Sequence, residues 1–185
     1  MRIISGKARG TKLYTLEGTN TRPTLDRIKE SLFNIIQNKL VNGTILDLFA
    51  GSGALALEAL SRGAKKAILC DNNIKAIEII NKNIEKCHFE DRTNVVYKDY
   101  KKCIQNLNEK VDIVFIDPPY RLDISIDAIR KILEHEILKD DSLIILETDD
   151  EERELNELDK IENIEIKDLR RYGRVKLIFL NKKGM

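Results

Sequence analysis

Short apolar runs rich in β-branched residues alternate with amphipathic stretches along the middle of the chain. Such alternation is typical of a parallel sheet whose two faces are covered by helices. The apolar spacing predicts strands at residues 44–49, 66–71, 93–97, 111–116 and 142–147. Helices are predicted at residues 54–62, 74–87, 100–107, 126–135 and 151–158. The pattern therefore predicts a doubly wound α/β domain.

The two ends of the chain depart from this alternation. Two apolar runs at residues 164–169 and 175–180 flank an arginine-rich turn, which predicts a terminal hairpin with antiparallel strands. Near the amino terminus, residues 2–4 and 12–14 predict a smaller hairpin that is punctuated by glycines.

A helix is predicted to begin at Thr24, a good N-cap residue, with Asp26 in its first turn. Its apolar positions should dock it on the main body; they are Leu25, Ile28, Leu32, Ile35 and Ile36. We therefore expect residues 1–20 to form an appendage and residues 21–185 to form a single domain.

The composition is that of a folded protein, with 42% hydrophobic and 34% charged residues in a chain of 185. Apolar runs reach only strand length and the first residues lack an apolar signal core, so we expect a cytoplasmic protein without a membrane span. The cysteines at positions 70, 87 and 103 form no C-x-x-C pair, which argues against a disulfide framework or a zinc site. We expect a monomer that binds no metal.

A net charge of +1 conceals a strong asymmetry along the chain. Residues 1–44 hold eight basic and three acidic side chains, and residues 166–185 hold seven basic and one acidic. Residues 140–165 hold two basic and twelve acidic side chains. Two basic ends around an acidic block indicate a polyanionic partner, which the net charge alone would argue against.

A glycine turn follows the first strand of the predicted sheet and leads into a helix. Gly51, Gly53 and Ala56 match the pattern G-x-G-x-x-G/A of nucleotide-binding turns, and Asp71 follows at the end of the next strand. In this arrangement the turn approaches the ligand closely and the carboxylate of Asp71 accepts hydrogen bonds from ribose hydroxyls. A dehydrogenase would hold a pyrophosphate here, but Asp47 on the strand favours a ligand that carries an ammonium and a sulfonium.

A second motif, Asp117-Pro118-Pro119-Tyr120, ends a later buried strand and should meet the glycine turn at the same edge of the sheet. Two successive prolines stiffen the loop. The carboxylate of Asp117 and the carbonyl of Pro118 can accept both N–H bonds of an exocyclic amine, while the ring of Tyr120 stacks on the base. Orientation and electrostatics would then direct the nitrogen lone pair at a methyl donor.

Together these two motifs resemble the class I S-adenosylmethionine methyltransferases that act on exocyclic amines. The sequences at residues 2–10 and 21–34 are similar to those of the RsmD family, whose members methylate N2 of a guanine in 16S ribosomal RNA. The resemblance implies a Rossmann-like, seven-stranded, mostly parallel sheet whose last strand is inserted antiparallel. It also implies S-adenosylmethionine as cofactor and ribosomal RNA as partner, either free or within the small subunit or an assembly intermediate.

The resemblance assigns roles residue by residue. Asp117, Pro118, Pro119 and Tyr120 would hold the target guanine. The expected cofactor-binding residues are Asp47, Phe49, Ala50, Gly51, Ser52, Gly53, Asp71, Asn72, Asp99 and Tyr100. Asp99 and Tyr100 stand where an adenine ring would lie, with helix capping by Asp99 as the close alternative, and Asn73 stands where the family often has an acidic residue.

Basic residues near the amino terminus are expected to contact RNA phosphates beside the active edge. The RNA-binding candidates, all basic except Thr24, are Arg2, Lys7, Arg9, Lys12, Arg22, Thr24 and Arg27. Arg170, Arg171 and Arg174 are weaker ones. The acidic residues 149–159 should face away from RNA. Three alternatives stay open: an adenine-N6 methyltransferase of DNA or RNA, an NAD(P)-dependent oxidoreductase, and a non-catalytic RNA-binding protein.

Overall fold

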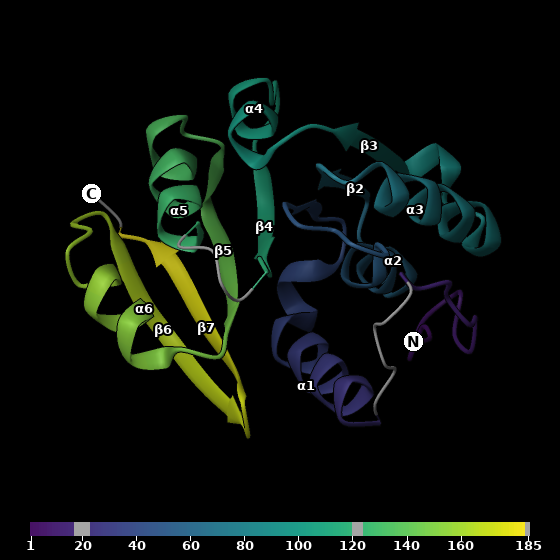
Figure 1. Cartoon of the computed structure of the whole chain (residues 1–185), viewed down its shortest axis with the longest axis horizontal. Coiled ribbons are helices and arrows are strands. Elements are labelled where there is room, and N and C mark those ends of the chain that lie inside the picture. The colour runs from purple at the N-terminus through teal and green to yellow at the C-terminus, as the bar shows by residue number, and fades with distance from the viewer. Residues whose placement is uncertain (17–22, 120–123, 184–185) are drawn as a thin grey trace.

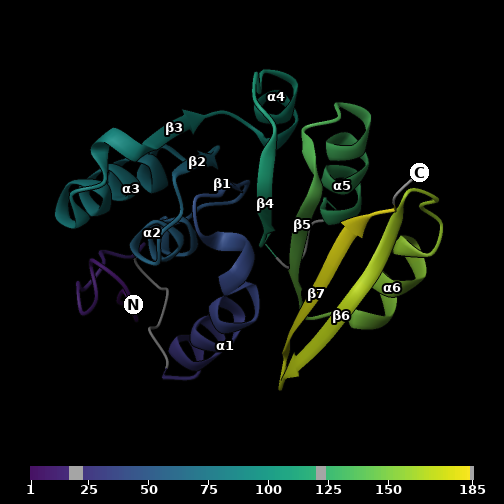
Figure 2. The ribbon, with the colours of Figure 1, turned by 180° about the vertical axis from the view of Figure 1, so that it is seen from behind.

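A computed structural model describes residues 1–16, 23–119 and 124–183. A seven-stranded sheet runs in the order β3-β2-β1-β4-β5-β7-β6 (Figures 1 and 2). The strands are β1 (Thr44–Asp47), β2 (Lys66–Asp71), β3 (Thr93–Tyr97), β4 (Val111–Ile116), β5 (Leu138–Thr148), β6 (Ile164–Tyr172) and β7 (Val175–Lys182). The first five are mutually parallel, while β7 runs antiparallel between β5 and β6. The predicted fold class and terminal hairpin are thus confirmed.

Six α-helices and one 3-10 turn surround this sheet in the described residues. They are α1 (Pro23–Leu40), α2 (Ala54–Ser61), α3 (Ile74–Cys87), η1 (Glu90–Arg92), α4 (Tyr100–Gln105), α5 (Ser125–Glu134) and α6 (Glu151–Leu158). Helices α1 to α3 cover one face and α4 to α6 the other, so that the sheet separates two apolar cores. Strand β4 shows why, because Ile113 and Phe115 enter the first core and Val114 and Ile116 the second.

Helix α1 differs from its prediction at both its start and its buried face. The helix begins at Pro23, which places Thr24 in the first turn and not at the N-cap. Ile35, expected to dock the helix, is 40% exposed, whereas Phe33 is fully buried. The reason is a tilted ring contact between Phe33 and Phe115 of β4, with centroids 5.8 Å apart, which turns Ile35 outward.

Strand β5 begins earlier than predicted, at Leu138. Residues 139–141 are exposed, and the register of β5 against β4 shifts between Val111 and Ile113. The polar Lys-Asp-Asp sequence at this irregular start of the strand has no apolar periodicity. This explains why the sequence pattern did not predict the first residues of β5.

The amino-terminal segment (residues 1–16) packs against the first face of the sheet. Arg2 and Lys12 form an antiparallel bridge, and the neighbouring Ile3 and Leu13 are buried in the core shared by α1, α2 and α3. Gly6 comes so close to α2 that an added Cβ would overlap the carbonyl oxygen of Ser61. The segment is therefore fitted closely to the helices beneath it.

A fully buried carboxylate on α2 holds this segment in place. Glu58 accepts hydrogen bonds from the backbone N–H groups of Ile4 (2.8 Å) and Ser5 (3.0 Å). Its charge is met by Arg62 at 2.8 Å and by Lys29 of α1 at 3.2 Å. One side chain thus ties three parts of the molecule together.

In the described part of the chain, no helix is long and apolar enough to cross a membrane.

Candidate active site

The carboxyl ends of β1 and β4 lie side by side at the centre of the sheet, where Asp47 is paired in register with Phe115. From β1 the chain continues to one side through β2, and from β4 it continues to the other side through β5. Open α/β sheets bind ligands at such a switch point. The loops at residues 48–53 and 117–119 both begin there, so the structure brings the two predicted motifs together.

The glycine loop (residues 48–53) has an open side. Gly51 and Gly53 have left-handed backbone angles, with φ of 55° and 78°. A Cβ added to Gly53 would press on Leu69 at 3.0 Å, whereas one added to Gly51 would meet nothing within 4 Å. Gly53 is therefore needed for packing, and the space beside Gly51 is free for a ligand.

Asp47 lies beneath this loop with an unsatisfied oxygen. The side chain is 1% exposed, and its Oδ1 atom has no hydrogen-bond partner among the described residues. Burial raises its pKa to about 7, with a smaller contribution from Asp71, although backbone hydrogen bonds from Phe49 and Ala56 lower it. A buried acceptor of this kind favours a ligand with a cationic N–H donor and disfavours a pyrophosphate.

Asp71 at the end of β2 is held firmly beside the loop. Its Oδ2 accepts the backbone N–H of Gly51 at 2.8 Å, and its Oδ1 accepts that of Asn73 at 2.8 Å. Each oxygen keeps a further lone pair, which is the requirement for binding ribose hydroxyls. Asn72, the adjacent candidate, is exposed.

Two aromatic rings border the loop on the side of α4. The rings of Phe49 and Tyr100 lie 5.5 Å apart at 44°, and the hydroxyl of Tyr100 donates to Asp127 of α5 at 2.6 Å. Burial and this hydrogen bond raise the pKa of Tyr100, so its hydroxyl stays protonated. Asp99 accepts the backbone N–H of Lys102 at 3.0 Å and so caps α4, which is the helix-capping role that the sequence also allowed.

On the other side of the switch point, Asp117 and Pro119 follow β4 with the buried Pro118 between them. Burial raises the pKa of Asp117 well above its ordinary value, and the carboxylates of Glu147 and Asp47 raise it further. Tyr120, the fourth residue of the motif, lies outside the described residues. The site therefore groups three carboxyl groups at the ends of β1, β4 and β5.

The RNA-binding candidates are spread along the amino-terminal segment and α1. Arg2, paired with Asp26 at 3.1 Å, and Lys12 are exposed, and so is Arg27. Arg22 and the side chain of Thr24 lie outside the described residues.

The turn that carries Lys7 and Arg9 does not lie beside the active edge, contrary to expectation. The backbone N–H of Lys7 donates to the carbonyl of Ser61, the last residue of α2. The glycine loop lies at the other end of this helix, before its first residue, Ala54. Eight helical residues separate the two by about 12 Å. The expected position was wrong because the close approach at Gly6 fixes the turn at the far end of α2.

Charges in the terminal hairpin are partly neutralised by the acidic helix α6 and by a carboxylate of the hairpin itself. Arg171 makes two hydrogen bonds to Glu151 of α6, at 2.5 and 2.7 Å, and Arg170 pairs with Asp168 at 2.8 Å. Arg174, at the turn, is exposed. The acidic helix thus lies against the hairpin, and among the described residues Arg174 is an exposed arginine without an ion pair.

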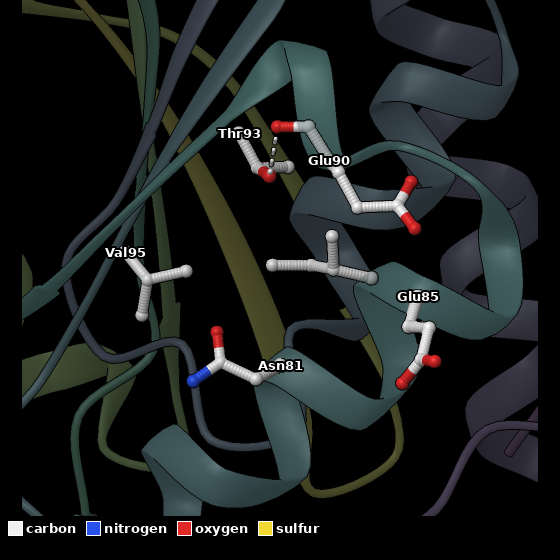
Figure 3. Close-up of a pocket in the computed structure, with 6 residues that line it drawn as sticks. Asn81, Glu85, Glu90, Thr93 and Val95 are labelled. Carbon is white, nitrogen blue, oxygen red and sulfur yellow. Dashed lines mark hydrogen bonds between the residues drawn. The ribbon is translucent and has the colours of Figure 1, made fainter.

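A hollow of about 570 Å³ lies elsewhere, between α3 and β3 (Figure 3). Its lining includes Glu85, Glu90 and Thr93, the last two linked by a hydrogen bond from the Thr93 hydroxyl at 3.4 Å. Thr93 begins β3, so this hollow lies at the amino edge of the sheet and not at the switch point. Within the described ranges, no three His, Cys, Asp or Glu side chains are grouped to hold a metal ion.

Sequence reasoning missed four polar residues with structural contacts at or near the site. Asn83 contacts the glycine loop, Asp127 contacts Tyr100, Glu147 acts on Asp117, and Glu58 holds the amino-terminal segment. Asn83 had a visible signal, because it is a polar residue within the apolar stripe of α3 that includes Ile80, Ile84 and Cys87. The others had none, since a charged residue on a predicted helix or at a strand end is usually solvated.

Comparison with known proteins found a matching family model and similar relatives. The family model described as Conserved hypothetical protein 95 matches residues 1–181. Ribosomal RNA small subunit methyltransferase D of Haemophilus influenzae is 39% identical over 80% of this chain and 79% of its own length, and that of Escherichia coli is 36% identical over 80% and 75%. The solved structure of the Escherichia coli protein yhhF is 28% identical, with a TM-score of 0.84 over 100% of this chain and 99% of its own.

Proposed function

The chain belongs to the family described as Conserved hypothetical protein 95, the RsmD family, and from this premise we propose that it methylates ribosomal RNA. The donor is S-adenosylmethionine, and the acceptor is the exocyclic N2 amine of a guanine in small-subunit RNA. Two relatives bear the name ribosomal RNA small subunit methyltransferase D, which supports the RNA class. The finer assignment rests on the chemistry of the two loops.

The observation that carries the proposal is the unsatisfied Oδ1 of Asp47 beneath an open glycine loop. A buried carboxylate without a partner is costly unless a cation satisfies it. The ammonium of the donor's methionine part supplies that cation, and Asp71 has free lone pairs for the ribose. The residues present therefore fit S-adenosylmethionine, which when bound supplies an electrophilic methyl group.

Asp117 and Pro118 orient the acceptor. The Asp117 carboxylate and the Pro118 carbonyl each accept one N–H of the guanine amine, which holds the nitrogen lone pair toward the glycine loop. Transfer leaves a proton in excess on that nitrogen. Because its pKa is raised, ionised Asp117 is a suitable acceptor for this proton.

RNA is held by exposed cations on both sides of the switch point. Arg2, Lys12 and Arg27 lie on the side of α1, and Arg174 lies at the turn of the terminal hairpin. Their contacts with phosphates position the RNA without reading its sequence. Lys7 and Arg9 serve as more distant phosphate contacts, and the amino-terminal segment acts as an appendage of one methyltransferase domain.

The alternatives fit the site less well. A pyrophosphate of NAD(P) would be opposed by Asp47 and would leave the Asp117 loop without a role. An adenine-N6 methyltransferase would use the same loop, but both named relatives are enzymes of ribosomal RNA.

An acceptor panel tests the proposal. The protein is incubated with methyl-labelled S-adenosylmethionine and, in parallel, naked 16S RNA, unmodified small-subunit particles and duplex DNA. Label in RNA or particles is the expected result, and an Asp117→Ala variant serves as the negative control. Label in DNA alone, or in no acceptor, would overturn the proposed function.

A further inference from the structure

Asn83 of α3 is fully buried and bonds to the backbone of two other parts of the chain. Its Nδ2 donates to the carbonyl of Tyr14 and to the carbonyl of Ser52, both at 2.9 Å. Its Oδ1 accepts the backbone N–H of Tyr14 at 2.8 Å. Both amide hydrogens are thus used, and no alternative rotamer of the amide preserves all three bonds.

The bond to Ser52 acts on the part of the glycine loop between its two glycines. Ser52 stands between Gly51 and Gly53, and each glycine gives the backbone wide conformational freedom. The loop is fixed at Gly51 by Asp71 and at Gly53 by the carbonyl of Ala50, 2.6 Å from the Gly53 nitrogen. Asn83 supplies a third bond, at the carbonyl between the two glycines.

On its other side, Asn83 pairs with Tyr14 as a neighbouring strand would, through both backbone groups of that residue. The amino-terminal segment that carries Tyr14 is itself anchored on α2 by hydrogen bonds to the carboxylate of Glu58 and to the hydroxyl of Ser61. The backbone N–H of Ala8 donates to this hydroxyl at 2.9 Å. Asn83 therefore joins a firmly docked segment to the glycine loop.

We propose that Asn83 is a positioning residue that holds the glycine loop in its cofactor-binding conformation, with the amino-terminal segment as its support. The inference deepens the proposed function and rests on it, because it assumes that the loop binds the donor. It assigns to the amino-terminal segment a task toward the cofactor as well as toward RNA.

Binding of S-adenosylhomocysteine, measured by calorimetry, tests this role without turnover. Asn83→Ala is expected to raise the Kd about tenfold, the effect of losing one ordered hydrogen bond that shapes the loop. Asn81→Ala is the matched control, because Asn81 lies on the same helix with an exposed side chain beside the hollow of Figure 3. This control should bind like the wild type.

Hydrogen exchange separates positioning from general loss of structure. In Asn83→Ala, the amides of residues 11–16 and 50–53 should exchange faster, while those of β2 should keep their wild-type rates. Asn83→Asp provides a second variant if the first folds poorly. It keeps the side-chain volume and the acceptor for Tyr14 but loses both donors, so it too should weaken binding.

The outcomes distinguish this inference from the proposed function. If the wild type does not bind S-adenosylhomocysteine, the proposed function fails and this inference fails with it. If the wild type binds and both Asn83 variants bind equally tightly, only the role of Asn83 is refuted. Uniformly faster exchange, including β2, would also refute it, because that pattern indicates a purely structural side chain.

Discussion

Replacing Glu58 by glutamine perturbs the buried carboxylate that ties the amino-terminal segment to α1 and α2. The substitution keeps the volume but removes the charge that faces Lys29 and Arg62, whose side chains are only 5% and 6% exposed. It also turns an amide toward the N–H groups of Ile4 and Ser5. Removing one member of a buried ion pair costs about 3–5 kcal/mol.

A loss of this size is a large part of the total stability of an ordinary domain, which is about 5–15 kcal/mol. With a urea dependence of about 2 kcal/mol per M, the unfolding midpoint should fall by roughly 1.5–2.5 M. Glu134→Gln is the control, because that residue forms an exposed ion pair with Lys131 at 2.7 Å and should not move the midpoint.

The same variant leaves Lys29 buried without its partner carboxylate. Burial already lowers the pKa of Lys29, and Glu58 opposes that shift. Adding Lys29→Met to Glu58→Gln should therefore recover part of the lost stability, since it removes an uncompensated buried cation. A midpoint for Glu58→Gln equal to that of Glu134→Gln would refute the reasoning.

Three further predictions follow from the loops and the docked segment. Gly6→Ala should lower the unfolding midpoint clearly more than Gly10→Ala in the same urea titration, because both glycines have positive φ but only the former would overlap Ser61; equal shifts would contradict the close approach. The pKa of Asp47 is raised to about 7, so S-adenosylhomocysteine affinity measured by calorimetry should increase by up to tenfold for each unit that the pH rises toward 7, while the ligand-free protein loses stability over the same pH range. Asp47→Asn should flatten both pH dependences, and a pH-independent wild type would contradict the assignment. Asp117→Ala should lower methyl transfer at least about a hundredfold and leave S-adenosylhomocysteine binding unchanged, whereas lost binding would show that Asp117 serves the cofactor.

Apolar periodicity was sufficient to predict most of the sheet and its covering helices. The strands at 66–71, 93–97 and 111–116 and the helix at 74–87 have the bounds that the sequence predicted. Strands β2 and β4 and helix α3 bury one or both faces, so their pattern of side chains records the core, whereas β3 is at most half-buried. The Lys-Asp-Asp sequence near the start of β5 was missed because its side chains are exposed and the register with β4 is irregular there.

The two loops of the candidate site were predictable for a related reason. Their glycines, prolines and carboxylates stand at strand ends, and parallel strands bring these ends to one edge. The ion pairs that fix the surrounding elements were not predictable. Glu58 and Arg171 are ordinary charged residues in the sequence, and only the tertiary packing shows that one is fully buried and the other paired with Glu151.

The identity of the methylated nucleoside tests the central claim most directly. Small-subunit particles labelled by the wild-type protein are digested to nucleosides and separated beside N2-methylguanosine and N6-methyladenosine standards. The account predicts that the label comigrates with N2-methylguanosine and is absent when the Asp117→Ala variant is used. Label in N6-methyladenosine, or in N2-methylguanosine at an undiminished level with Asp117→Ala, would contradict it.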